Sequence, residues 1–478
     1  MAGPYPVPNA TIPYWRTELH ELDSHRSTVE LPKKQDIVII GAGFAGAALA
    51  HYLLKDNPSK PSITILEARE ACSGASGRNG GQLRASRFAN VARNMQAWGL
   101  ETANQVALFE VANAQAIAAL VAEQHIACDL RAVTTADVFV DAAEAAKITR
   151  LWDAMSRLDC PTLRDVTCHG PGDAAERATG VKGAKVAFAY ESYLMWPYKF
   201  VMHLLAGVVG KGKGKGGEGG VNLQTHTPVH EVSETPDTEG YWTVATSRGA
   251  VKARKVLFAT NGYTGGLLPE YDDAIYAARG SVARVVSTSS SSSSPPAPAF
   301  DSCGLDSKSP ATVDSYFGTR ADGSLIVGGA RSAYIQDRSQ WYRNFDDSTL
   351  IAPAVPFFEG WARKTLVGWD GESTGTVESV WTGIMGYTAD DAPHVGLVPA
   401  KPGLYICAGF NGHGMPNVLL CAKGLAAMVR DGATFADTGI PACYETGAAR
   451  LRKIAEGAAA RTTGRARADI YLKYQSGC

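Results

Sequence analysis

The strongest constraint on the fold of this chain lies in residues 36–67. An apolar run rich in Ile and Val ends at a Gly-x-Gly-x-x-Gly pattern, a helical stretch follows, and a second apolar run ends on an acidic residue. The glycines are Gly41, Gly43 and Gly46, and the acid is Glu67. This order of strand, glycine turn, helix, strand and acid is typical of a βαβ unit that binds a dinucleotide.

Each part of the pattern has a mechanical role in such a site. Gly41 permits the tight turn, Gly43 lets a pyrophosphate approach the backbone, and Gly46 lets the helix pack closely on the strand. The helix N-terminus offers free N–H groups and a partial positive charge to the phosphates. Glu67 is placed to accept hydrogen bonds from an adenosine ribose.

The glycine pattern alone is a weak signal in this chain. With 50 Gly in 478 residues, chance supplies about half a match per chain. The run 211–220 contains two such matches, at Gly212–Gly217 and Gly214–Gly219, but no strand precedes it and no helix follows. That run is expected to be a flexible, basic surface loop. The alternative for 41–46 is a buried βαβ unit whose glycine turn binds nothing.

Composition limits the remaining possibilities. The length predicts about two or three domains, and the net charge of −1 provides no global basic field for nucleic acid. The sequence contains no uninterrupted run of ~18 apolar residues, so no membrane span is predicted. The first residues lack a signal-peptide pattern, and the last three are not the common peroxisomal signal. Nine dispersed cysteines without a CxxC pair predict reduced thiols, no metal site and a cytoplasmic protein.

The rest of the chain alternates between helical and strand-like segments. Residues 1–35, rich in Pro, are expected to form an extended arm on the body, and the Ser- and Pro-rich residues 287–298 a mobile insertion. Asp322-Gly323 predicts a hairpin. Helices are expected at 92–126, 142–157, 196–210 and 416–430, and strands at 133–140, 221–232, 241–247, 250–259 and 404–410.

Three junctions between a strand and a glycine turn are spread over the chain, at 41–46, 260–262 and 409–414. Ligands of open parallel sheets bind at the carboxyl ends of strands, so we expect all three to line one crevice. The predicted fold is α/β, with a Rossmann-type domain interleaved with an α+β substrate domain built on a mixed sheet. Its predicted bounds are 36–125, 190–283 and 375–460 for the first domain, 126–189 and 284–374 for the second, and 461–478 for a C-terminal tail.

Four segments together resemble one family, the D-amino-acid oxidase-like FAD-dependent oxidoreductases. They are the fingerprint at 36–46, the loop Gly74–Arg84 (GASGRNGGQLR), the strand end Leu257–Tyr263 (LFATNGY), and the pair Trp381–Pro393 and Gly409–Gly414. The resemblance spans residues 36–430 and is nearest to the branch that holds sarcosine oxidase and γ-glutamylputrescine oxidase. It implies FAD in place of NAD, and a two-domain fold with the substrate domain over the flavin.

The resemblance also implies which residues hold the cofactor. The loop 74–84 would wrap the flavin, residues 260–261 would support the adenine half, and the helix after 409–414 would stabilise the anionic reduced flavin. The residues expected at the FAD are Gly41, Ala42, Gly43, Phe44, Ala45, Gly46, Glu67, Ala68, Arg69, Ser76, Gly77, Arg78, Asn79, Gly80, Gln82, Leu83, Val229, Thr260, Asn261, Gly262, Gly383, Gly409, Asn411, Gly412, His413, Gly414 and Met415.

At the substrate end, Arg84 and Arg87 resemble the flavin-proximal and carboxylate-binding arginines of the sarcosine branch. The expected catalytic residues are these two and His413, which either contacts the flavin or supports its turn. That branch has a Lys directly after the Gly-His-Gly turn, where this chain has Met415, and a flavin-linking Cys near Gly383, where this chain has none. Non-covalent FAD is therefore expected, with an amine that has a distant or absent carboxylate, or an unusual substrate.

The expected activity is oxidation of an amine or amino acid by hydride transfer to flavin N5, with oxygen as acceptor and an imine and hydrogen peroxide as products. The alternatives are a dehydrogenase that uses a quinone or protein acceptor, a flavin-binding protein with a decayed substrate site, and an NAD-dependent dehydrogenase. Five aromatic residues are candidates for the cavity wall, with ordinary core packing as the more common role of each: Tyr193, Trp196, Tyr316, Phe317 and Trp381.

Overall fold

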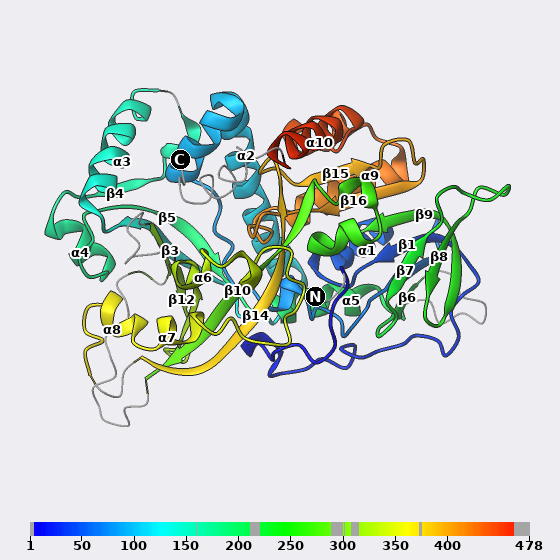
Figure 1. Ribbon diagram of the computed structural model, residues 1–478, viewed down its shortest axis with the longest axis horizontal. Coiled ribbons are helices and arrows are strands. Elements are labelled where there is room, and N and C mark those ends of the chain that lie inside the picture. Colours follow the sequence, from blue (N-terminus) through cyan, green and yellow to red (C-terminus); the bar gives the residue numbers. More distant parts are fainter. Residues whose placement is uncertain are drawn as a thin grey trace.

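The computed structural model describes residues 4–158, 160–210, 220–287, 300, 302–306, 315–371 and 375–462. The basic glycine run at 211–219, residues 288–298 of the Ser- and Pro-rich segment and most of the predicted tail lie outside these residues. Within them the chain forms two eight-stranded sheets, which lie on the right and left of Figure 1.

The first sheet is largely parallel and has the order β15-β16-β9-β1-β2-β6, with β8 beside β9 and β7 beside β8. The neighbours β16, β9, β1, β2 and β6 run parallel, as a βαβ unit requires. Its strands are β1 (Lys34–Ile40), β2 (Ile63–Leu66), β6 (Val221–Gln224), β7 (Val229–Val232), β8 (Trp242–Thr246), β9 (Gly249–Phe258), β15 (His394–Leu397) and β16 (Leu404–Ala408).

The second sheet is mixed and has the order β14-β10-β13-β12-β11-β3-β5-β4. All its neighbours are antiparallel except β11 and β3. Its strands are β3 (Arg131–Phe139), β4 (Thr167–His169), β5 (Val186–Leu194), β10 (Ile275–Val286), β11 (Ser302–Asp306), β12 (Ser315–Thr319), β13 (Leu325–Gly329) and β14 (Thr376–Thr388). These two sheets confirm the predicted α/β class with a mixed-sheet second part.

The helices pack on the outer faces of the sheets and between them. The longest, α2, contains a break at Gly99, where φ is 81° and the backbone is not helical. The helices are α1 (Phe44–Leu54), α2 (Phe88–Gln124), α3 (Ala142–Met155), α4 (Asp173–Thr179), α5 (Pro197–Val208), α6 (Arg331–Tyr334), α7 (Ala354–Phe358), α8 (Trp361–Thr365), α9 (Val418–Asp431) and α10 (Ala448–Thr462).

Most of the predicted elements are present with shifted ends. The predicted helix 416–430 begins at Val418, and the predicted hairpin joins β12 to β13 across Asp322-Gly323. The long pair β10 and β14 of the second sheet was not predicted. Strand β14 and most of β10 lie within segments assigned to the first domain. The domain bounds themselves stay a prediction.

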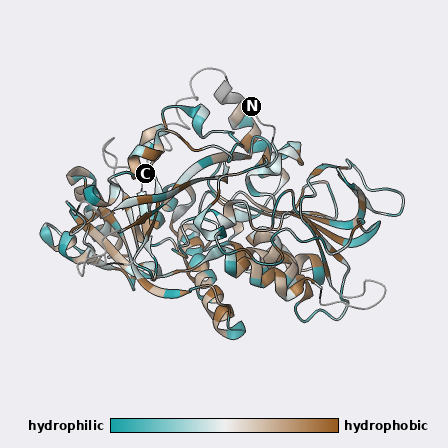
Figure 2. Cartoon of the chain, turned by 90° about the horizontal axis from the view of Figure 1, so that it is seen from below, coloured by the Kyte–Doolittle hydropathy of each residue, from teal (hydrophilic) through white to brown (hydrophobic). Residues whose placement is uncertain are grey.

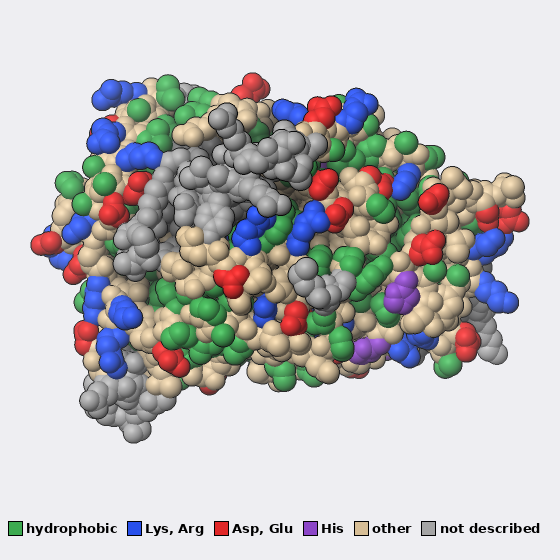
Figure 3. All heavy atoms as spheres, in the orientation of Figure 1, with side chains coloured by type: hydrophobic (Ala, Val, Ile, Leu, Met, Phe, Trp, Pro, Cys, Tyr) green, Lys and Arg blue, Asp and Glu red, His purple; other side chains and the backbone are tan. Residues whose placement is uncertain are grey.

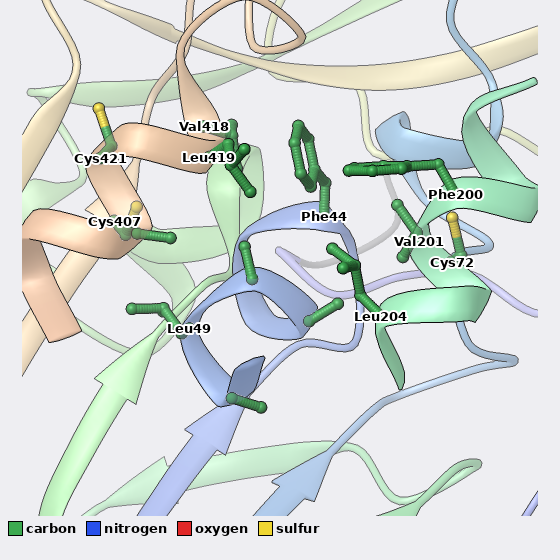
Figure 4. Packing of buried hydrophobic residues seen from close by; sticks show 14 of the residues in the cluster. Phe44, Leu49, Cys72, Phe200, Val201, Leu204, Cys407, Val418, Leu419 and Cys421 are labelled. Atoms are coloured by element: carbon green, nitrogen blue, oxygen red, sulfur yellow. The ribbon is translucent and has the colours of Figure 1, made fainter. Parts of the chain in front are cut away.

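Helix α1, which carries the glycine turn, is buried between α5 and α9 (Figure 4). Phe44 at its start meets Phe200 of α5 edge to face, with ring centres 5.5 Å apart. Leu49 and the α9 residue Leu419 belong to the same fully buried cluster. In Figure 2, brown, hydrophobic stretches alternate with teal, hydrophilic ones along the helices and strands. Helix α1 is thereby held between α5 and α9.

Among the described helices, the stretch Asn94–Gln124 of α2 is long and apolar enough to cross a membrane by length and composition. It nevertheless buries Glu110 and Asn113 and packs along α9 and α3. A core helix of a folded protein passes the same test.

The substitution Phe200→Ala tests how strongly this core supports α1. Phe200 is fully buried, and we expect its removal to cost about 3–5 kcal/mol of unfolding free energy. Leu108→Ala, at a side chain that is 45% exposed, is the control and should change stability by less than about 0.5 kcal/mol. Urea unfolding of both variants measures the difference, and equal effects would contradict this packing.

Candidate active site

A cavity of about 550 Å³ is lined by residues of both sheets. The first sheet contributes the carboxyl ends of β1 and β2 and the turn after β9, while the second contributes β10, β11, β12 and β14. Residues from all three predicted glycine junctions line it, as expected for one crevice. On the face shown in Figure 3, acidic and basic side chains are interspersed around the described surface.

The glycine turn after β1 has the geometry that a pyrophosphate site needs. Gly41 has φ of +107°, and a Cβ at Gly46 would lie 1.9 Å from the carbonyl oxygen of Gly41. The next residues, Gly43, Phe44 and Ala45, line the cavity at the N-terminus of α1. The positive end of the helix therefore borders the space where a diphosphate would bind. Within the described residues, the Phe44 N–H donates to Ser76 Oγ at 2.8 Å.

Glu67 follows β2 at the edge of the same cavity. One oxygen of its carboxylate accepts a hydrogen bond from the Ala42 N–H at 2.8 Å, and the other from the Arg69 N–H at 3.0 Å. These bonds fix the orientation of the carboxylate at the position expected to receive ribose hydroxyls.

A buried ion cluster joins the two halves of the molecule beside this turn. Arg69 donates both terminal nitrogens to Asp347, at 2.8 and 3.0 Å, and Arg78 Nε lies 3.6 Å from the same carboxylate. Burial alone would lower the pKa of Arg69, but the hydrogen bonds to Asp347 outweigh it and raise the pKa. Burial lowers the pKa of Arg78 to about 10. Both guanidinium groups stay charged near neutral pH and line the cavity.

Two polar atoms of the cavity wall have no hydrogen-bond partner within the described residues. They are Tyr263 Oη and Ser281 Oγ, both shielded from solvent. Burial raises the pKa of Tyr263, so its hydroxyl keeps its proton. An unmet buried donor costs free energy, which a polar bound group would recover. These atoms, the glycine turn and the two arginines fit a cofactor that carries phosphates and a polar ring.

The turn at 409–415 is held by two asparagines. Asn261 Oδ1 accepts hydrogen bonds from the N–H groups of Gly409 and Phe410, at 3.0 and 3.3 Å. Asn411 Oδ1 accepts the Thr388 N–H at 2.7 Å. Both asparagines have positive φ, a conformation that Asn tolerates. The segments 260–262 (Thr-Asn-Gly) and 410–412 (Phe-Asn-Gly) therefore join the ends of β9, β14 and β16 at the cavity.

Glu110 anchors the same turn from the opposite side. Its carboxylate is 3% exposed and lies 3.0 Å from His413 Nε2. It also accepts the Ser86 N–H and, at 3.2 Å, the Asn417 side-chain amide. Tyr444 Oη extends the network to Asn417 at 2.9 Å. His413 does not line the cavity, so this arrangement favours the supporting role over contact with the flavin.

Arg84 lines the cavity but is already paired. It contacts Asp137 of β3 in an ion pair, and its Nε donates to Tyr190 Oη at 3.0 Å. Gly304 lies opposite Asp137 in the register of β11 and β3, and a Cβ there would lie 2.1 Å from Arg84 Nη1. Arg87 is buried near the Tyr190 ring and does not line the cavity.

Arg331 also lines the cavity, beside Arg69, Arg78 and Arg84, and it was not predicted from the sequence. It begins α6 directly after β13, and its Nη2 donates to Tyr387 Oη at 2.6 Å. Tyr316 and Tyr334 complete this wall, and burial raises the pKa of Tyr334 to about 12. The only sequence signal for Arg331 is its position after a glycine-rich strand end, and that pattern matches no motif.

The predicted residues divide between the cavity wall and its support. Those that line the cavity are Gly41, Gly43, Phe44, Ala45, Glu67, Ala68, Arg69, Ser76, Arg78, Asn79, Arg84, Val229, Thr260, Asn261, Gly383, Gly412, Gly414 and Met415. Those that lie outside the wall are Ala42, Gly46, Gly77, Gly80, Gln82, Leu83, Arg87, Gly262, Gly409, Asn411 and His413.

Of the five aromatic candidates, Tyr316 lines the cavity. Phe317, its neighbour on β12, is fully buried in the core of the second sheet. Trp381 is also buried, and its Nε1 donates to the Arg78 carbonyl at 2.8 Å. The role of most of these rings is therefore packing.

The variant Glu110→Gln tests the Glu110 anchor through pH. Burial opposes ionisation, but His413 and the Ser86 N–H outweigh it and hold the pKa of Glu110 below its ordinary 4.5. The stabilisation is therefore fully present above pH 4.5 and is lost as the pH falls through the lower value in the folded protein. We expect the urea midpoints of wild type and Glu110→Gln to differ at pH 7 and to converge below pH 4.5. A difference independent of pH would contradict this network.

Comparison with known proteins agrees with this geometry. A family model described as FAD dependent oxidoreductase matches residues 36–428. A protein named "Probable oxidoreductase OrdL" from Rhizobium meliloti is 25% identical over 393 residues, 82% of each chain. Glycine oxidase from Geobacillus kaustophilus has a TM-score of 0.65 at 18% identity, over 84% of this chain and 96% of its own. L-proline dehydrogenase from P. horikoshii has a TM-score of 0.58 at 16% identity, over 84% and 95%. With a fold, a dinucleotide turn and a family match that agree, this chain belongs to the DAO family of FAD-dependent oxidoreductases.

Proposed function

We propose that this enzyme oxidises the carbon–nitrogen bond of an amine or amino acid, with oxygen as the final electron acceptor. The observation that carries the proposal is the continuity of the cavity. It runs from the glycine turn of the first sheet to a polar floor on the second sheet, where Arg84, Asp137 and Arg331 lie. A cofactor anchored at the turn would place its reactive end beside that floor.

The chemistry is a two-electron oxidation that balances without a metal. The substrate loses a hydride from the carbon next to nitrogen and a proton from nitrogen, and becomes an imine. Bound FAD supplies the hydride acceptor, and oxygen takes up two electrons and two protons as hydrogen peroxide. Water then hydrolyses the released imine to a carbonyl compound and ammonia or an amine.

The residues of this chain bind and orient the substrate. Arg331, at the end of β13, is our proposed partner for a substrate carboxylate, because a guanidinium pairs with a carboxylate in two parallel hydrogen bonds. Arg84, by contrast, is held by Asp137 and Tyr190. The half-buried ring of Tyr316 packs against Gly80 and Gly328 at this end of the cavity.

We also propose that FAD is bound without a covalent link. Gly383 lines the cavity and has no side chain that could form one. Cys407 also lines it, but burial raises the pKa of that thiol to about 12. A protonated thiol is a poor nucleophile.

Two alternatives remain for the electron acceptor and the site. A dehydrogenase on the same scaffold would pass electrons to a quinone or a protein, and one structural relative carries the name dehydrogenase. A decayed site would bind FAD and oxidise nothing, but the charged floor formed by Arg331, Arg84 and Asp137 favours a working site. The resemblance to the sarcosine and γ-glutamylputrescine branch stays a proposal.

Anaerobic mixing with a panel of amino acids, N-methyl amino acids and aminoalkyl compounds tests the activity. We expect at least one substrate to bleach the flavin, and oxygen to restore the colour rapidly with one equivalent of hydrogen peroxide. Bleaching with slow reoxidation in air would replace the oxidase with the dehydrogenase. If no compound of the panel bleaches the flavin, the proposed substrate class is contradicted.

The variants Arg331→Gln and Arg331→Lys test the proposed carboxylate partner. Loss of a charge-assisted hydrogen bond should raise KM for a carboxylate substrate by about 10- to 100-fold. Arg331→Lys should recover part of the loss, because it keeps the charge. The control is Arg177→Gln, at an arginine whose side chain is 74% exposed on α4. An unchanged KM in Arg331→Gln would assign the carboxylate elsewhere.

A further inference from the structure

The amino-terminal segment Pro4–Trp15 does more than lie on the surface. Pro4, Tyr5 and Pro6 form part of the cavity wall, beside Val229 of β7. Tyr5 Oη donates to the His230 carbonyl at 3.1 Å, and the two rings meet at 5.9 Å. The segment thus covers the cavity at the end expected to hold adenosine. In Figure 1 the dark blue trace passes between the two sheets.

The middle of the segment accepts hydrogen bonds from the two arginines of the buried ion cluster. Arg69 Nη1 donates to the Val7 carbonyl at 3.1 Å, and Arg78 Nη2 donates to the Thr11 carbonyl at 2.6 Å. Thr11 also donates its N–H to the Asp347 carbonyl at 2.8 Å. Without the segment, two buried cations that line the cavity would each lose an acceptor, which is costly.

The far end of the segment is fixed in the core. Trp15 is fully buried, and its Nε1 donates to the carbonyl of Asn79 in the cavity loop. Trp196 Nε1 in turn donates to the Trp15 carbonyl at 2.7 Å. Trp15 therefore anchors the segment, while residues 4–11 extend from that anchor along the cavity.

The composition of the segment suits this role. Prolines at 4, 6, 8 and 13 restrict φ to extended conformations, which lowers the entropy lost when the segment lies flat. Proline also has no N–H, so a wall built from it leaves fewer unpaired donors facing a cavity. A proline-rich extended segment can therefore line a binding site without a neighbouring strand.

We infer that residues 4–11 are a further part of the FAD site, a strap over the adenosine half that slows dissociation of the cofactor. FAD leaves only after the strap has lifted from Arg69, Arg78 and His230. By reciprocity, bound FAD stabilises the docked strap. This role concerns retention of the cofactor and is independent of which substrate is oxidised.

The rate of FAD loss from the diluted holoenzyme tests the strap. Two variants loosen it at opposite ends of the segment. Tyr5→Ala/Pro6→Gly acts at the wall, and Thr11→Ala removes the Oγ1 that accepts a hydrogen bond from Arg78 Nη1 at 3.1 Å. We expect FAD to dissociate about tenfold faster or more from the double variant, since such contacts act mainly on the off-rate. Ile12→Ala is the matched control, because this neighbouring side chain is 75% exposed. Flavin fluorescence and flavin retained after gel filtration give the rates without any substrate.

Limited proteolysis provides a second readout that needs no variant. Cleavage by proteinase K within residues 9–11 of the strap should slow about fivefold or more when FAD is added to the apoprotein. Trypsin cleavage after the exposed Arg177 on α4 is the control and should change less. FAD dissociation from the double variant at the wild-type rate, in a protein of unchanged circular dichroism, would overturn the inference. So would a rate of cleavage within residues 9–11 that FAD does not change.

Discussion

The buried contact of Asp347 with Arg69 and Arg78 is the interaction on which the site depends. Arg69 lies two residues after Glu67 of the first sheet, Arg78 belongs to the loop 74–84, and Asp347 comes from the second half of the molecule. Asp347 is fully buried, and Arg69 and Arg78 are buried as well. Removing either the carboxylate or the arginines would leave a buried charge without a partner, which is strongly destabilising. The cluster thereby fixes the relative position of the two sheets around the cavity.

Much of the fold could be predicted because its signals are local. The turn at 41–46 combines a strand, three spaced glycines and a helix, and a Cβ at Gly46 would meet the Gly41 carbonyl oxygen at 1.9 Å. Asn-Gly pairs marked the other two junctions, because Asn tolerates the positive φ found at 261 and 411. The family match then confirmed the FAD-dependent oxidoreductase that the four motifs implied.

The substrate end could not be predicted from local signals. Asp137 and Gly304 face each other only because β3 and β11 pair in parallel, although more than 160 positions separate them in the chain. Arg331 lies in no motif, and its position follows from the register of the second sheet. Resemblance alone pointed to Arg87, which the structure places outside the cavity wall. Long-range pairing therefore decides which charges line the cavity.

The central claim is that one cavity holds FAD with its diphosphate at the glycine turn and its ring over the second sheet. A crystal structure of the protein with FAD tests this directly. We predict diphosphate density at the N–H groups of Gly43–Ala45, ribose at Glu67, and the isoalloxazine ring between the 412–415 turn and β14. Density for the diphosphate away from α1, or for the ring away from the second sheet, would contradict the account.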